Sequence, residues 1–99
     1  MSENIFDNIP KPADKEFFEE LLLKNGLKIE RIVSFGHTTP ELEKDEWVIL
    51  LKGEAVISFL NGDDVRLKAG DYINIAAHKK HKVSWTKPDE ESIWLAVHY

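Results

Sequence analysis

The apolar positions in the first quarter of the chain repeat at the spacing of a helix. Four large side chains follow one another at intervals of one, three and one residues, namely Phe17, Phe18, Leu21 and Leu22. Asp14 can cap a first turn, and Asn25-Gly26 tolerates the left-handed backbone of a helix end. The pattern predicts one short amphipathic helix over residues 14–24, preceded by an extended arm over residues 1–13.

Short runs rich in β-branched and aromatic residues follow Gly26, and turn residues separate them. The runs are 27–35, 46–51, 54–60, 65–67, 72–75, 81–86 and 93–98. Regularly spaced short strands without intervening helices are typical of an antiparallel barrel or sandwich. The sequence therefore predicts an all-β fold behind the helix, with residues 14–99 forming a single domain.

The first clear pair of strands has an apolar face with one charged member. If Lys52-Gly53 is a two-residue hairpin turn, one face carries Glu46, Val48, Leu50, Ala55, Ile57 and Phe59. An ionised carboxylate on such a face is costly unless a cation or hydrogen bonds compensate its charge. We therefore expect a partner group beside Glu46.

The opposite face of the same strands is also apolar, with Trp47, Ile49 and Leu51. A sandwich of this size has one interior, so this second face needs a cover. The predicted helix, the N-terminal arm or a second copy of the chain could supply it. We expect a homodimer.

Composition excludes several classes of function. Thirteen Lys plus Arg against 18 Asp plus Glu give a net charge of −5, which opposes binding to nucleic acid or to anionic membranes. The absence of cysteine excludes disulfides and thiolate chemistry. The longest apolar run, Trp47 to Leu51, is far too short to span a membrane, so we expect a soluble cytoplasmic protein.

The spacing of glycines, a glutamate and a histidine resembles a known family. Six residues lie between Glu46 and Gly53, and Gly70 precedes His81 by the interval of a second motif. The stretch from Gly36 to His81 resembles the two motifs of the cupin superfamily, which are small jelly-roll β-barrels. The resemblance implies an antiparallel jelly-roll fold, which commonly pairs into dimers.

The resemblance also implies a metal site, with one departure from the family pattern. The His-x-His pair of the first motif would fall on Thr39 and Glu41, or on Pro40 and Leu42. Glu46 and His81 match the remaining ligands, and His37, His78 or Glu41 could complete a site for Zn, Mn, Fe or Ni. The alternative is a hydrogen bond between Glu46 and His81 without metal.

A pocket for a small molecule is expected inside the barrel. Its candidate lining consists of Glu46, Val48, Phe59, Tyr72, Val83 and Trp85, although the aromatic members could simply fill a small barrel. Three functions stay open: a metal-dependent enzyme, a non-catalytic ligand-binding or sensor cupin, and a dimeric interaction module. His98 alternates with Trp94 and Ala96, and we expect it only to cap the end of a sheet.

Overall fold

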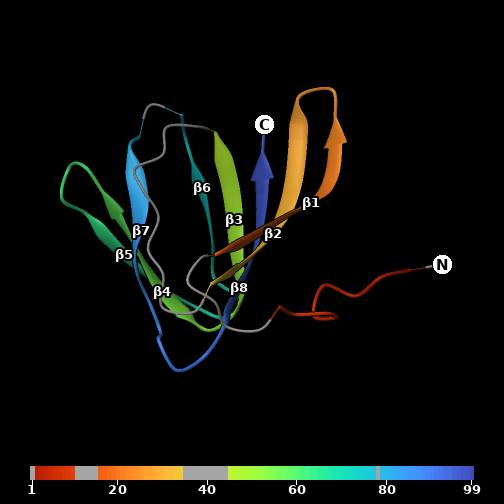
Figure 1. The fold of residues 1–99 in the computed structure, drawn as a ribbon. Coiled ribbons are helices and arrows are strands. Elements are labelled where there is room, and N and C mark those ends of the chain that lie inside the picture. The colour runs from red at the N-terminus through yellow and green to blue at the C-terminus, as the bar shows by residue number, and fades with distance from the viewer. Residues whose placement is uncertain (1, 11–15, 35–44, 78) are drawn as a thin grey trace.

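Two antiparallel sheets make up the described part of the chain (Figure 1). The computed structural model describes residues 2–10, 16–34, 45–77 and 79–99. The strands are β1 (Phe17–Lys24), β2 (Leu27–Ser34), β3 (Glu46–Lys52), β4 (Glu54–Phe59), β5 (Asp64–Lys68), β6 (Tyr72–Ile75), β7 (His81–Thr86) and β8 (Ser92–His98). One sheet has the order β1-β2-β8-β3-β6 and the other β5-β4-β7. The all-β prediction is confirmed.

The predicted helix over residues 14–24 is wrong, because residues 17–24 form strand β1. Lys24 pairs with Leu27 of β2, so Asn25 and Gly26 make a two-residue turn with φ values of 50° and 82°. Positive φ at both positions is the requirement of the type I′ hairpin turn, for which Asn-Gly is the favoured pair.

The described ranges contain no helix long and apolar enough to cross a membrane.

The core lies between the two sheets. Its buried members are Val48, Leu50, Ala55, Ile57, Leu67, Ile75, Trp94 and Ala96. The predicted inward face of β3 and β4 is therefore confirmed, but their hairpin pairing is wrong. β3 pairs with β6 and β8, whereas β4 pairs with β5 and β7. The strands face each other across the core, and strict side-chain alternation keeps the same residues inward in both arrangements.

Gly53 is the corner at which the chain passes from one sheet to the other. Its φ is +94°, and a Cβ atom there would lie 2.7 Å from the Ser92 side-chain oxygen and 3.0 Å from the Ser92 Cα. Only glycine satisfies both the backbone conformation and the close approach. This corner sets the position of β3, whose first residue is Glu46.

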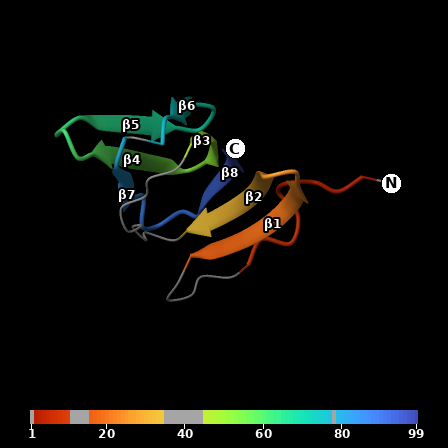
Figure 2. The ribbon, with the colours of Figure 1, turned by 90° about the horizontal axis from the view of Figure 1, so that it is seen from above.

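The N-terminal arm is held against the first sheet by one buried side chain. The Arg31 guanidinium donates hydrogen bonds to the carbonyl oxygens of Ile5 at 3.0 Å, Asp7 at 2.6 Å and Asn8 at 3.4 Å. It also forms a 2.5 Å ion pair with Glu19 of β1. Figure 2 shows this arm beside the β1–β2 hairpin, which extends away from the three-stranded sheet.

Candidate functional site

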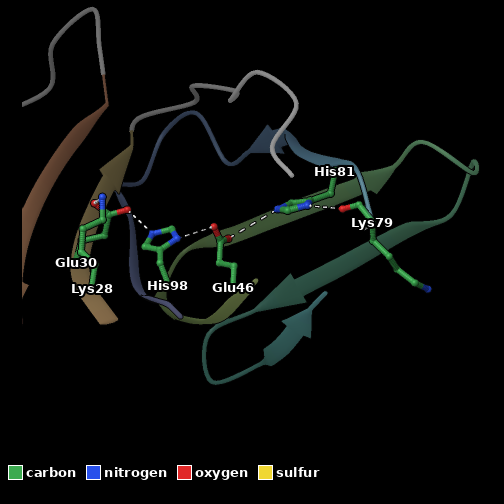
Figure 3. A network of polar contacts seen from close by, with 6 residues as sticks. All are labelled: Lys28, Glu30, Glu46, Lys79, His81 and His98. Carbon is green, nitrogen blue, oxygen red and sulfur yellow. Dashed lines mark hydrogen bonds and ion pairs between the residues drawn. The ribbon is translucent and has the colours of Figure 1, made fainter. Parts of the chain in front are cut away.

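Glu46 lies at the centre of a buried polar network, between two histidines (Figure 3). Its side chain points into the molecule, and the residue is 7% exposed. One carboxylate oxygen is 3.8 Å from His81 Nε2, and the other is 3.4 Å from His98 Nδ1. The expectation of a partner beside Glu46 is therefore confirmed.

Three strands of one sheet and one of the other supply this network. Glu46 begins β3 and is the register partner of His98, near the end of β8. His81 begins β7 in the facing sheet, so it reaches Glu46 across the gap between the layers. Glu30 comes from β2, on the far side of β8, and its Oε1 is 2.7 Å from His98 Nε2. Lys28, also on β2, places its Nζ 3.7 Å from the second oxygen of Glu30.

The hydrogen bond at His81 Nδ1 determines whether Nε2, the ring nitrogen that faces Glu46, carries a proton or a lone pair. His81 Nδ1 is 3.0 Å from the Lys79 carbonyl oxygen, and a carbonyl can only accept, so Nδ1 carries a proton. In a neutral imidazole the lone pair of Nε2 then faces a carboxylate oxygen. Two acceptors facing each other repel, so a proton, a cation or a hydrogen-bond donor between them would stabilise this pair.

The same reasoning applies to His98. Its Nε2 donates to the Glu30 carboxylate, which leaves Nδ1 as the atom that faces Glu46. Within the described ranges, His81 Nε2 and His98 Nδ1 are both buried without a hydrogen-bond partner. The site therefore has two imidazole nitrogens that are open to a polar group and that flank one carboxylate.

The neighbours of His81 favour its charged form. The Glu46 carboxylate raises the pKa of His81 above its ordinary value, and the hydrogen bond to the Lys79 carbonyl acts in the same direction. Burial of the ring opposes these effects, and the net direction is upward. The His81 imidazole therefore keeps its proton to a higher pH than an ordinary histidine does.

The described residues meet only part of the requirement for a metal centre. The His81 tautomer suits a metal ligand, because Nδ1 is engaged by a carbonyl while the Nε2 lone pair is free. However, no group of three His, Asp or Glu side chains in the described ranges is arranged to hold a metal ion. His37, Glu41 and His78 lie outside the described residues. The described part of the chain thus provides an acid–base pair but not a metal-binding set.

The structure separates the expected pocket lining into two groups. Val48 belongs to the core, and Phe59 and Val83 pack against it from the side of His81. Tyr72 is 66% exposed and stacks on Trp47 at a ring distance of 5.5 Å. Trp85 is 36% exposed and lies under the Arg66 guanidinium. Tyr72 and Trp85 point outward because they occupy the outward positions of their strands, so they are not brought to Glu46.

A hollow lies next to His81 on the molecular surface. Its volume is about 430 Å³, and it is lined by Phe59, Leu60, Asn61, Lys79 and Lys80. The Phe59 ring is 6.0 Å from the His81 ring, and the Lys79 carbonyl bonds the same imidazole. The hollow therefore shares two residues with the immediate surroundings of His81, and two lysines contribute to its wall.

Sequence reasoning missed His98 and Glu30. The expectation that His98 only caps a sheet is wrong, because this residue links two carboxylates inside the molecule. Its alternation with Trp94 and Ala96, both buried, is the signal that it belongs to the inward face. Glu30 carries no such signal, because only the pairing of β2 with β8 brings it beside His98.

Two antiparallel sheets around a compact core, with a Glu and a His meeting between the layers, define a small jelly-roll protein. The chain belongs to the cupin domain family, which matches residues 36–98. The resemblance found in its motifs is thereby confirmed.

Several solved structures are similar over nearly the whole chain. A protein from Ralstonia eutropha JMP134, named as a "putative mannose-6-phosphate isomerase", is 38% identical, with a TM-score of 0.91 over 99% of this chain and 96% of that one. A cupin superfamily protein from Desulfitobacterium hafniense DCB-2 is 22% identical, with a TM-score of 0.76 over 91% and 82%. An RmlC-like cupin from Desulfovibrio desulfuricans is 14% identical, with a TM-score of 0.78 over 99% and 95%. None of the curated proteins matches this chain.

Proposed function

We propose that this cupin binds a small polar molecule at Glu46 and His81 and exchanges a proton with it. The observation that carries the proposal is the Nδ1 hydrogen bond of His81, which turns the Nε2 lone pair toward a carboxylate oxygen 3.8 Å away. A hydroxyl group of a ligand, which carries a proton to donate, could take the place of the shared proton. A carboxylate and an imidazole at this separation can act as a base and an acid toward the same ligand.

The remainder of the network supports this role. His98 and Glu30 continue the line of alternating carboxylates and imidazoles away from the site, toward Lys28. His81, whose charged form is favoured by its neighbours, lies beside Glu46 and lowers the cost of burying that carboxylate. The same chain of groups orients the carboxylate, because His98 contacts the oxygen that His81 does not.

The hollow beside His81 suggests an anionic ligand. Lys79 and Lys80 supply positive charge at a surface that also has two apolar side chains, Phe59 and Leu60. The 38% identical relative is named for a sugar phosphate isomerase. Interconversion of an aldose and a ketose moves a proton between adjacent carbon atoms, which is chemistry that suits an acid–base pair. A phosphorylated sugar is therefore the substrate class that we propose.

A metal-dependent cupin is the second candidate, and the His81 tautomer favours it. Glu46 and His81 would hold a divalent ion such as Zn, Mn, Fe or Ni, together with ligands from outside the described residues. A bound ion would supply Lewis acidity at the same place.

Ligand titration with matched variants tests the proposal. Mannose 6-phosphate is titrated into the native protein, Glu46→Gln, His81→Gln and the control Glu20→Gln, an exposed site on β1, and histidine side-chain NMR signals report binding. We expect at least roughly tenfold weaker binding in the two site variants and native affinity in the control. Equal affinity in all four proteins would refute the proposed site, and no binding by the native protein would refute the substrate class.

Elemental analysis of the same four proteins separates the two candidates. A stoichiometric metal in the native protein and in Glu20→Gln, lost from Glu46→Gln and His81→Gln, would establish the second candidate in place of the first. Binding of the sugar phosphate by metal-free protein would support the first.

A further inference from the structure

The hollow beside His81 is bounded by two segments that backbone hydrogen bonds tie together. One segment is the turn that follows β4, where the Phe59 N–H donates to the Asp63 carbonyl at 2.8 Å. The other precedes β7, and its Lys80 carbonyl accepts a 3.0 Å hydrogen bond from the Leu60 N–H. This last bond joins the two walls directly, so they keep a fixed spacing. The volume of about 430 Å³ lies within the range of roughly 300–1,000 Å³ that is typical of small-molecule sites.

Two lysines of this hollow have no carboxylate partner among the described residues. Lys79 and Lys80 are both exposed, and neither takes part in an ion pair within the described ranges. Lys52 and Arg66, by contrast, are each paired with a glutamate. In a chain with a net charge of −5, two adjacent ammonium groups without partners create a local positive potential.

None of the described residues that line the hollow is acidic. Asp63 lies in the same turn as Asn61, but it is not part of the wall. Its carboxylate accepts a 3.4 Å hydrogen bond from Asn61 Nδ2, and its N–H donates to Asn61 Oδ1 at 3.1 Å. The wall of the hollow therefore combines two cations with two apolar side chains, and this composition is suited to an anion that has a carbon skeleton.

Charge and geometry favour a phosphate monoester as that anion. Such a group carries about −1.5 to −2 charges at neutral pH and has three acceptor oxygens. Lys79 and Lys80 can neutralise this charge, and each ammonium group supplies several N–H donors. A carboxylate carries a single charge, so it would leave one of the two lysines without a counter-ion.

The His81 ring separates the hollow from the Glu46 carboxylate (Figure 3). Its Nδ1 faces the Lys79 carbonyl at 3.0 Å, whereas its Nε2 faces Glu46 at 3.8 Å. A phosphate placed directly beside Glu46 would meet a buried group of the same charge, and the two would repel. A phosphate held by the lysines would instead lie on the other side of the imidazole from that carboxylate.

We propose that this hollow is a phosphate subsite, in which Lys79 and Lys80 bind the phosphate group of the ligand that reaches Glu46 and His81. The proposal rests on the proposed function for the identity of that ligand. Recognition of phosphate by the two lysines is nevertheless a property of the hollow alone, so it is measurable without the sugar.

Lys79 connects the phosphate subsite to the acid–base pair. Its side chain lines the hollow, and its carbonyl accepts the Nδ1 proton of His81. Figure 3 shows the carbonyl turned toward the imidazole and the side chain directed away from it. A phosphate bound to the Lys79 ammonium restrains the residue whose backbone directs His81 Nε2 toward Glu46. Binding energy from a group that does not react thereby helps to orient the groups that do.

Inorganic phosphate is the probe that tests the subsite. It is titrated at a constant ionic strength of about 0.15 M, where the Debye length is about 8 Å, and the backbone amide NMR signals of Leu60 and Asn61 report the affinity and the place of binding. The variants are Lys79→Gln, Lys80→Gln and the double variant. Lys82→Gln is the matched control, because it removes the same charge from an exposed position on β7 that does not line the hollow. All three lysines are exposed, so the variants should fold, which circular dichroism verifies.

We expect each single variant in the hollow to weaken phosphate binding at least roughly threefold, and the double variant at least roughly tenfold. Lys82→Gln should change the affinity by less than about twofold, because its charge is screened by salt. Absence of binding to the native protein at phosphate concentrations on the order of 10 mM would overturn the proposal. Native affinity in the double variant would also overturn it, as would equal weakening by Lys82→Gln, which would indicate a general effect of charge.

Two crossed titrations distinguish this proposal from the proposed function. Glu46→Gln should bind inorganic phosphate as the native protein does but bind mannose 6-phosphate more weakly, whereas the lysine double variant should weaken both. If phosphate binding depends on the lysines while mannose 6-phosphate binding is unaffected by Glu46→Gln, the proposed function is refuted and the phosphate subsite is supported. Loss of inorganic phosphate binding in Glu46→Gln would place the anion at the acid–base pair and overturn the subsite.

Discussion

Replacing Glu46 with glutamine should destabilise the protein more at acidic than at alkaline pH. The substitution keeps the shape of the side chain but removes the charge that faces His81 Nε2 at 3.8 Å. At an effective dielectric constant of about 20, this separation corresponds to roughly 4 kcal/mol of attraction for a charged pair, and to about 1 kcal/mol in bulk water. The loss should lie between these limits when His81 is protonated, and it should be small when the imidazole is neutral.

The direction of the pH dependence follows from the raised pKa of His81. A histidine whose folded pKa exceeds its unfolded value of about 6.5 contributes full stability below pH 6.5. That contribution is lost as the pH rises through the folded pKa. The free energy of unfolding of the native protein should therefore exceed that of Glu46→Gln by more at pH 5.5 than at pH 8.5. These conditions lie about one unit below and about two units above the ordinary histidine pKa.

Urea denaturation followed by tryptophan fluorescence measures the difference at the two pH values. His98 Nδ1 also faces Glu46, at 3.4 Å, so the His81→Gln background is needed to isolate one pair. In a double-mutant cycle, the coupling between Glu46 and His81 should appear at pH 5.5 and decline at pH 8.5. A destabilisation that is the same at both pH values would refute the charged-pair argument.

Two further predictions concern the framework around the site. Gly53→Ala should lower the free energy of unfolding by about 2 kcal/mol or more, because its Cβ would lie 2.7 Å from Ser92 Oγ at a φ of +94°. Gly62→Ala is the control, since Gly62 has a similar φ of +98° but nothing within 4 Å of the added Cβ. In the same urea denaturation assay, Gly62→Ala should lower the free energy of unfolding by less than Gly53→Ala. Arg31→Met should remove the hydrogen bonds to the carbonyls of Ile5, Asp7 and Asn8. Hydrogen exchange and proteolysis should then accelerate in the N-terminal arm, while β3 and β8 stay protected. Unchanged exchange in the arm would show that Arg31 does not hold the arm against the sheet.

Several features of this protein follow from its sequence alone. The alternation of apolar residues in 46–51 and 54–59 determines which side chains face inward, so the burial of Glu46 is predictable although the hairpin pairing is wrong. Side-chain direction depends only on the period of a strand, and it is indifferent to which strand lies alongside. The spacing of Glu46 and His81, together with the glycines that follow and precede them, likewise indicates the cupin family.

Tertiary pairing decided the remaining features. Asn25-Gly26 suits both a helix end and a type I′ turn. Because the preceding segment pairs with β2, these two residues form the turn, and the segment predicted to be a helix is strand β1. Glu30 and His98 are 68 residues apart in the chain, and they meet because β2 and β8 are neighbours in one sheet. Local patterns record the conformational preferences of adjacent residues, whereas the buried network depends on contacts between strands that are distant in sequence. The sequence therefore indicated Glu46 and His81, and the order of the strands in the sheet brought Glu30 and His98 beside them.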